Sequence, residues 1–202
     1  MKVIGLTGGI ASGKSTVSKY LKDQGIPILD ADQIAKDLVE VGEEGWFKLK
    51  KAFGERILLE DGKIDRPELG RIIFQDPEQR KVLNGILHPM VRARIDRTLE
   101  ELRCQGQELA VVDVPLLIEA EMTDMVEEVW LVSTDLDTQI ARLKARDQLN
   151  HAEALARINS QMSLEEKKKR ATVIIDNSGS IEDTLKQINK LLEERRLSGF
   201  TL

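Results

Sequence analysis

Residues 8–15 read Gly-Gly-Ile-Ala-Ser-Gly-Lys-Ser and fit the spacing G-x-x-x-x-G-K-[ST]. An apolar run from Val3 to Leu6 precedes this stretch, and a helical pattern from Lys14 to Gln24 follows it. In such a strand–loop–helix unit, glycines let backbone N–H groups turn toward phosphate oxygens, and the helix start adds its positive dipole. The stretch therefore predicts a phosphate-binding loop rather than an ordinary glycine-rich turn with a solvated lysine.

The loop predicts a nucleotide site. Lys14 is expected to reach the β- and γ-phosphates, and the Ser15 hydroxyl is expected to ligate Mg²⁺. GTPases, motor ATPases and small-molecule kinases share such a loop, so it does not identify the reaction. The sequence lacks the Asn-Lys-x-Asp of guanine specificity, and 202 residues leave little room for a motor, which favours a kinase. The expected ATP-binding residues of the loop are Gly8, Gly9, Ala11, Ser12, Gly13, Lys14, Ser15 and Thr16.

The composition is that of one compact unit with insertions, because the 202 residues are 41% hydrophobic and 32% charged. A net charge of -5 gives no general attraction to nucleic acids or anionic membranes, and we expect neither as a partner. Cys104 is the single cysteine, and the apolar run at Val3 is too short for a signal or membrane segment. These features predict a cytoplasmic location. Cys104 follows Leu99 and Leu102 in a helical pattern, which predicts a buried or half-buried apolar role.

The predicted fold is α/β, with a five-stranded parallel sheet like that of P-loop NTPases, flanked by helices. The third strand is delayed by a long segment that looks almost wholly helical. We expect a nucleotide-binding core from residues 1–40, 105–136 and 171–202, a helical insertion from 41–104 and a charged insertion from 137–170. The predicted buried strands are Val3–Leu6, Pro27–Leu29, Leu109–Val112, Val129–Val132 and Val173–Ile175.

Capping signals begin helices in both insertions. The Asp61-Gly62 pair predicts either a small hairpin or a loop, and His88-Pro89 predicts either a helix-ending turn or a polar group facing an acceptor. In the second insertion we expect two or three short, poorly buried helices, and residues 167–170 are expected to form a solvated helix face. The capping pairs are Asp65/Glu68, Asp76/Pro77, Asn150/Glu153 and Ser163/Glu166.

Three acidic residues close predicted strands: Asp30 and Asp32 follow the second strand, and Asp113 follows the third. Ligands of open parallel sheets bind beyond the carboxyl ends of the strands, so we expect all three to face the phosphate loop. A carboxylate there can orient or deprotonate an acceptor hydroxyl, or hold Mg²⁺ through water. The structural alternative makes Asp32 the N-cap of a helix over 33–39 and Asp30 a turn residue.

Arginines of the second insertion are the candidate phosphate clamp. Arg142 and Arg146 are spaced i, i+4, which puts them on one helical face, and Arg157 follows on the next helix. Guanidinium groups bind phosphate oxygens in a bidentate manner and neutralise charge in the transition state. The alternative is a salt-bridged surface helix with Asp147 and Glu153 as partners.

Taken together, these motifs resemble dephospho-CoA kinases over essentially the whole chain. Only the phosphate loop is strong by itself, but the order and spacing of the motifs are specific together. The stretches that carry the resemblance are residues 4–10 leading into the loop, Asp30-Ala31-Asp32, His88-Pro89, residues 113–119 (Asp-Val-Pro-Leu-Leu-Ile-Glu), the arginine pair ending in Arg146-Asp147, and residues 175–179 (Ile-Asp-Asn-Ser-Gly).

The resemblance implies transfer of the γ-phosphate of Mg·ATP to the ribose 3′-hydroxyl of dephospho-CoA, the final step of coenzyme A synthesis. It implies that Asp32 is the base or orienter of that hydroxyl, and that Asn177 contacts the adenine. Lys14, Arg142 and Arg146 would act on the phosphates, with the arginines carried by a lid over residues 137–170.

The insertion over residues 41–104 resembles the CoA-binding lobe, and a monomer is the expected state. Asp32 or Asp113 would hold Mg²⁺ through water. Two alternatives are another small-molecule or nucleoside monophosphate kinase, and a nucleotide-dependent switch. The residues expected to contact the acceptor are Asp32, His88, Asp113 and Leu116.

Overall fold

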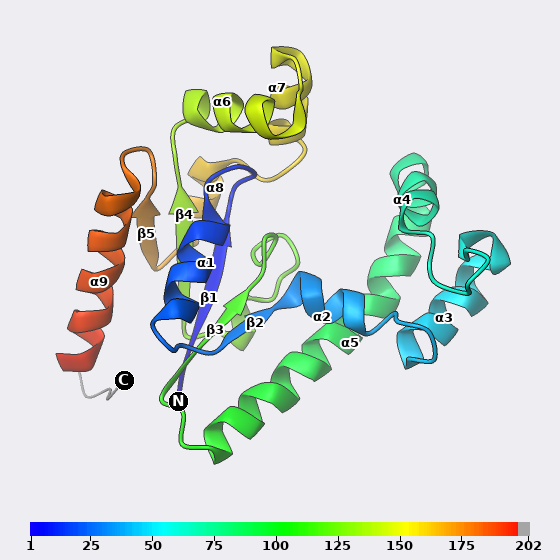
Figure 1. Ribbon diagram of the computed structural model, residues 1–202, viewed down its shortest axis with the longest axis horizontal. Coiled ribbons are helices and arrows are strands. Elements are labelled where there is room, and N and C mark those ends of the chain that lie inside the picture. Colours follow the sequence, from blue (N-terminus) through cyan, green and yellow to red (C-terminus); the bar gives the residue numbers. More distant parts are fainter. Residues whose placement is uncertain (198–202) are drawn as a thin grey trace. The chain divides into compact units, whose positions relative to one another are not determined.

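A computed structural model describes residues 1–197, in which five strands between Lys2 and Asp176 form one sheet (Figure 1). The strand order is β2-β3-β1-β4-β5, and β1 pairs in parallel with both β3 and β4. The parallel five-stranded prediction is confirmed. Because β1 is central, its carboxyl end at Gly8 lies where the chain changes direction across the sheet, the usual place for a ligand. The strands are β1 (Lys2–Gly8), β2 (Ile28–Asp30), β3 (Leu109–Asp113), β4 (Glu128–Ser133) and β5 (Val173–Asp176).

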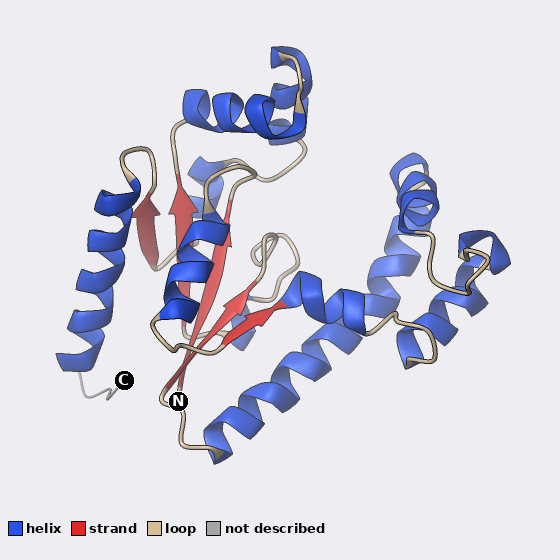
Figure 2. Cartoon of the chain, viewed as in Figure 1, coloured by secondary structure: helices blue, strands red, loops and turns tan. Residues whose placement is uncertain are grey.

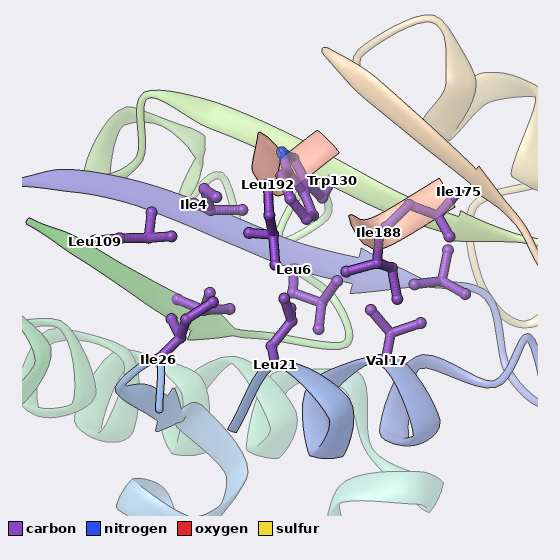
Figure 3. Close-up of a cluster of buried hydrophobic side chains, with 12 residues drawn as sticks. Ile4, Leu6, Val17, Leu21, Ile26, Leu109, Trp130, Ile175, Ile188 and Leu192 are labelled. Carbon is purple, nitrogen blue, oxygen red and sulfur yellow. The ribbon is translucent and has the colours of Figure 1, made fainter. Parts of the chain in front are cut away.

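Helices α1 (Lys14–Asp23) and α9 (Ile181–Leu197) pack against the sheet and against each other. Figure 3 shows their apolar side chains meeting those of the strands. Each such side chain contributes about 1.5–3 kcal/mol when fully buried. This packing fixes the direction of α1, and therefore the position of the loop that leads into it. The buried cluster includes Ile4, Leu6, Val17, Leu21, Trp130, Ile175, Ile188 and Leu192.

An ionic cluster around Glu128 joins the first strand, the fourth strand and the last helix. The carboxylate accepts hydrogen bonds from Trp130 Nε1 at 2.8 Å and Arg195 Nε at 3.0 Å, and it also pairs with Lys2. The Arg195 guanidinium lies 4.8 Å from the Trp130 ring centroid. Burial alone would raise the pKa of Glu128, but the hydrogen bonds from Lys2, Trp130 and Arg195 outweigh it and lower the pKa to about 2.

The chain divides into two compact units, one formed by residues 1–29 and 102 onward, the other by Asp30–Glu101. The second unit is built from helices, as Figure 2 shows, and it has its own core around Leu49, Phe53 and Ile57. None of the helices within residues 1–197 combines the length and apolar character needed to cross a membrane. The helices of the second unit are α2 (Ala31–Asp37), α3 (Glu44–Phe53), the short η1 (Glu55–Ile57), α4 (Arg66–Gln75) and α5 (Pro77–Cys104), the last of which ends in the first unit.

The start of α2 corrects one prediction. Asp30 leaves β2 in an extended conformation, and its carboxylate accepts a hydrogen bond from the Gln33 backbone N–H at 3.0 Å. Asp30 is therefore the N-cap, and the structural alternative in which Asp32 caps this helix is wrong. Asp32 lies in the first turn, where a negative charge interacts favourably with the helix dipole.

Helix α5 corrects two more predictions. It continues through His88 and Pro89, so a helix-ending turn, the first of the two alternatives for this pair, is wrong, and a polar group facing the acceptor stays a prediction. Pro89 cannot donate a backbone hydrogen bond, and the packing of Val91, Ile95 and Leu99 holds the helix together beyond it. Cys104, the last residue of α5, is exposed rather than buried or half-buried.

The Asp61-Gly62 turn does form a hairpin in minimal form, because Leu58 and Ile64 make an isolated antiparallel bridge. Two caps predicted in the insertions are confirmed. Asp65 accepts from the Glu68 N–H at 3.0 Å, and Asn150 with Glu153 forms a complete capping box.

The second insertion contains three helices, α6 (Leu136–Asp147), α7 (His151–Asn159) and α8 (Leu164–Lys168). The prediction of short helices is confirmed, but the prediction that they are poorly buried is wrong. Ile140, Leu143 and Ala154 form a buried cluster against the phosphate loop. Lys167, predicted to lie on a solvated face, is 0% exposed.

Candidate functional site

A cavity of about 710 Å³ lies over the phosphate loop, within the range of about 300–1,000 Å³ typical of ligand sites. Loop residues 8–15 line it together with Arg142 and Arg146 from α6. The structure therefore brings together the loop and the two arginines that the sequence singled out. Pro115, Ala145 and Gln161 complete the lining.

Gly13 caps α1 at a position that no other residue fits easily. Its φ of 92° lies in the left-handed region, and a Cβ added there would collide with the side-chain amide of Asn177. Ala11 also has a positive φ, at 58°. Residues of this conformation turn successive N–H groups to one side and make an anion-binding concavity. The first turn of α1 carries no acidic residue, so the helix dipole remains available to a bound anion.

Alternate carbonyls of the loop are held by side chains from distant parts of the chain. Gly8, Ile10 and Ser12 each accept a hydrogen bond from such a side chain, and the Ile10 N–H donates to Gln161 Oε1 at 3.0 Å. The loop conformation is therefore fixed from outside, which spares the cost of ordering it on binding. The three carbonyl contacts are Lys167 Nζ to Gly8 at 3.2 Å, Gln139 Nε2 to Ile10 at 2.7 Å and Asn177 Nδ2 to Ser12 at 2.7 Å.

Lys14 forms an ion pair with Asp113, the last residue of β3. Asp113 is only 4% exposed, and the Lys14 ammonium group compensates the negative charge of its buried carboxylate. The prediction that Asp113 faces the phosphate loop is confirmed. The Thr7 hydroxyl donates to the Pro115 carbonyl at 3.0 Å and fixes the segment after β3, on which Leu116 is exposed.

Arg142 and Arg146 share the cavity but are held differently. Arg142 donates to the Asn177 carbonyl at 2.9 Å and to the Ser12 carbonyl at 3.4 Å. Arg146 makes a bidentate pair with Asp147 at 2.8 and 3.0 Å, and its side chain is 58% exposed. Because exposed pairs contribute only about 0–1 kcal/mol, Arg146 can exchange its carboxylate for a phosphate at little cost.

Asp147 also accepts from Arg157 at 2.6 Å, so the ion pairs expected from the salt-bridge alternative are present at Arg146 and Arg157, and the phosphate clamp stays a prediction. The Arg146 hydrogen bond holds the pKa of Asp147 below its ordinary value. Glu153, the other expected partner, instead closes the capping box of α7.

Asn177 is 4% exposed, and its side-chain amide is used twice. It donates to the Ser12 carbonyl and accepts from Thr184 Oγ1 at 2.8 Å. These contacts support the loop, and Asn177 is absent from the described lining of the cavity. A contact between Asn177 and adenine therefore stays a prediction.

Asp32 and His88 belong to the helical unit. Asp32 lines a cavity of about 280 Å³ within that unit, together with Lys36, Arg66 and apolar side chains that include Leu69. His88 is exposed on α5. The prediction that Asp30 and Asp32 face the phosphate loop stays a prediction.

Sequence reasoning missed Gln139, Gln161 and Lys167 as residues of this site. The two glutamines lie in a charged insertion without a motif of their own, and only the fold brings them to Ile10. Lys167 begins a run of four basic residues, and nothing in the sequence distinguishes it from the three that follow.

Comparison with known proteins agrees with this site. A family model described as dephospho-CoA kinase matches residues 2–183. A dephospho-CoA kinase of Carboxydothermus hydrogenoformans is 50% identical over 194 residues, which cover 96% of this chain and 94% of the relative. A solved structure from Thermus thermophilus is 37% identical with a TM-score of 0.81, and covers 96% of this chain and 97% of its own.

The solved structure of a dephospho-CoA kinase from Campylobacter jejuni is 30% identical, with a TM-score of 0.75. That likeness covers 99% of this chain and 100% of the other. With a phosphate loop at the end of the central strand and a family match over most of its length, this chain belongs to the dephospho-CoA kinase family.

Proposed function

We propose that the chain transfers the γ-phosphate of ATP to the ribose 3′-hydroxyl of dephospho-CoA, giving coenzyme A and ADP. The observation that carries the proposal is the braced phosphate loop sharing one cavity with Lys14, Arg142 and Arg146. This activity is the final step of coenzyme A synthesis and makes the chain a small-molecule kinase.

On the ATP side, loop residues 8–16 bind the phosphates through their N–H groups, and Lys14 binds the β- and γ-phosphates. Arg146, which exchanges partners easily, stabilises the charge that spreads over the transferred group. Phosphoryl transfer needs little covalent chemistry from the protein, so positioning and electrostatic stabilisation supply most of the rate.

The residues present fit Mg²⁺ as the ion that accompanies ATP. The described residues contain no cluster of three acidic, histidine or cysteine ligands. Mg²⁺ bound with ATP takes few protein ligands, because phosphate oxygens and waters fill the remaining positions. The exposed Ser15 hydroxyl and, through water, the Asp113 carboxylate would hold it. When bound, the ion neutralises negative charge on the β- and γ-phosphate oxygens.

On the acceptor side, Asp32 orients the 3′-hydroxyl and accepts its proton. The cavity beside Asp32 supports this assignment, because apolar side chains suited to a base or an alkyl chain lie next to the cations of Lys36 and Arg66. We assign residues 41–104 to CoA binding and residues 137–170 to a lid over ATP. His88, Leu116 and Asn177 remain proposed substrate contacts, and a cytoplasmic monomer remains the proposed state.

A coupled assay with ATP and either dephospho-CoA or AMP tests the reaction. We expect ADP release that depends on dephospho-CoA and on Lys14, and Lys19→Met serves as a matched control because Lys19 is an exposed lysine of α1. Preference for AMP would favour a nucleoside monophosphate kinase. Slow hydrolysis independent of any acceptor would favour a switch and refute the proposal.

Hydrogen exchange tests the lid. Because Ile140, Leu143 and Ala154 are already buried, we expect their helices to be partly protected without ligands. ATP with dephospho-CoA should increase protection across residues 137–170. Equal protection with and without the substrates would indicate a static domain instead.

A further inference from the structure

Lys167 lies at a junction of three segments. Its ammonium nitrogen is 3.2 Å from the Gly8 carbonyl oxygen, 3.5 Å from that of Pro115 and 2.8 Å from Glu119 Oε1. Gly8 begins the phosphate loop, and Pro115 and Glu119 lie in the segment that follows β3. One side chain of α8 therefore connects the second insertion to the start of the phosphate loop and to the segment after β3.

The burial of Lys167 makes this contact unusual. The residue is 0% exposed, and lysine is almost never fully buried unless it is paired. Both Glu119 carboxylate oxygens are shielded from solvent, and within residues 1–197 neither makes a hydrogen bond of good geometry. The ammonium group of Lys167 therefore attracts the Glu119 carboxylate by charge, at 2.8 Å from Oε1, and donates its hydrogen bonds to the Gly8 and Pro115 carbonyls.

The same geometry excludes a direct role in binding phosphate. Lys167 is inaccessible to solvent and does not contribute to the described lining of the cavity over the loop. Its ammonium group instead contacts a carbonyl oxygen at the point where β1 becomes the loop. Because a hydrogen bond from a charged donor is about twice as strong as a neutral one, this contact strongly restricts the orientation of the Gly8 peptide.

We propose that Lys167 is a positioning residue for the ATP phosphates. It fixes the Gly8 peptide, and through it the path of residues 8–12, while Glu119 adds a countercharge that stabilises the buried ammonium group. The inference rests on the proposed use of this loop for ATP. It assigns Lys167 a larger effect on ATP affinity than on dephospho-CoA affinity.

The decisive comparison uses variants that separate charge from hydrogen bonding. Lys167→Met leaves the shielded carboxylate of Glu119 without its counterion, so a fall in melting temperature is expected from either a structural or a positioning role. Lys167→Met combined with Glu119→Gln removes both charges and should recover much of that fall. Glu119→Gln alone keeps both backbone acceptors of Lys167, the Gly8 and Pro115 carbonyls, and offers it an amide oxygen in place of the carboxylate, so we expect the contact with Gly8 to persist.

Calorimetry with a non-hydrolysable ATP analogue measures how tightly the loop binds the phosphates, independently of catalysis. We expect the double variant to bind it about tenfold more weakly than Glu119→Gln, with the KM for ATP raised in parallel. The KM for dephospho-CoA should rise less than the KM for ATP, because Lys167 reaches the segment of Leu116 only through the Pro115 carbonyl at 3.5 Å, the longer of its two backbone contacts. Lys168→Met is the matched control, because Lys168 pairs with the exposed Glu165 on the surface.

Equal analogue affinity of Glu119→Gln and the double variant would overturn the inference and leave Lys167 a structural residue. If Lys167→Met does not fold, the comparison of Glu119→Gln with the double variant still tests the inference. A wild-type chain that binds the analogue but does not phosphorylate dephospho-CoA would refute the proposed function. The affinity comparison for Lys167 would remain valid, because it depends only on binding of the analogue.

Discussion

Replacing Lys14 by methionine should weaken the fold as well as abolish phosphoryl transfer. Asp113 is 4% exposed and forms its ion pair with Lys14, so the variant leaves a buried carboxylate without a partner. Removing one member of a buried pair costs about 3–5 kcal/mol. The Lys14 side chain retains 19% of its exposure, so some water reaches the pair and we take the lower end, about 3 kcal/mol. For a chain of this size that corresponds to a fall in melting temperature of about 6–12 °C.

A double-mutant cycle with Asp113→Asn isolates the ion pair. The double variant removes the unpaired charge and should regain about 2 kcal/mol relative to Lys14→Met alone. Denaturant unfolding of all four proteins gives the free energies, and the coupled assay gives the activity. We expect both Lys14 variants to be inactive, while Lys19→Met behaves as wild type. A Lys14→Met variant that melts within about 2 °C of wild type would refute the reasoning from the ion pair.

Three further predictions concern single side chains. Asp32→Asn should lower kcat by about 10²–10⁴-fold and the melting temperature by no more than about 4 °C, because Asp30 is the cap of α2 and Asp32 adds a favourable charge in its first turn; near-normal kcat would end the catalytic assignment. Asp30→Ala, in contrast, should cost about 1 kcal/mol of stability. Arg146→Ala should lower kcat more than it raises the KM for ATP, whereas Arg142→Ala should mainly raise that KM because Arg142 bonds a loop carbonyl; identical kinetics of the two variants would contradict these roles. The pKa of Glu128 is lowered from 4.5 to about 2, so its stabilising effect is present above pH 4.5 and is lost as the pH falls toward 2. The stability difference between wild type and Glu128→Gln should shrink over that interval, and a constant difference in denaturant unfolding would count against it.

The phosphate loop could be predicted from the sequence because its determinants are local. The glycines, Lys14 and Ser15 lie within eight consecutive residues, and the flanking strand and helix follow ordinary periodicity. The same locality explains the correct capping predictions at Asp65 and Asn150. The error at Asp32 has a local cause too, since two aspartates separated by one residue compete for the same cap, and the extended backbone at Asp30 decides between them.

The supports of the loop could not be predicted in this way. Gln161 and Lys167 meet the loop across most of the chain, and no spacing rule connects such positions. Lys167 can be buried because folding brings it to the Gly8 carbonyl and the Glu119 carboxylate, which are both distant from it in the sequence. The same holds for α5, where tertiary packing carries a helix through Pro89 against the local preference.

Glu128 has a practical consequence for handling the protein. It binds Lys2 near the beginning of the chain and Arg195 near its end, so both terminal segments are tied to one carboxylate. A truncation that removes Arg195 therefore acts as a mutation inside a folded cluster and not as the trimming of a tail. A fusion partner attached ahead of Lys2 needs a spacer long enough to leave that ammonium group in place. Protection of α9 from proteases would show whether an engineered variant has kept the contacts of Glu128 with Lys2 and Arg195.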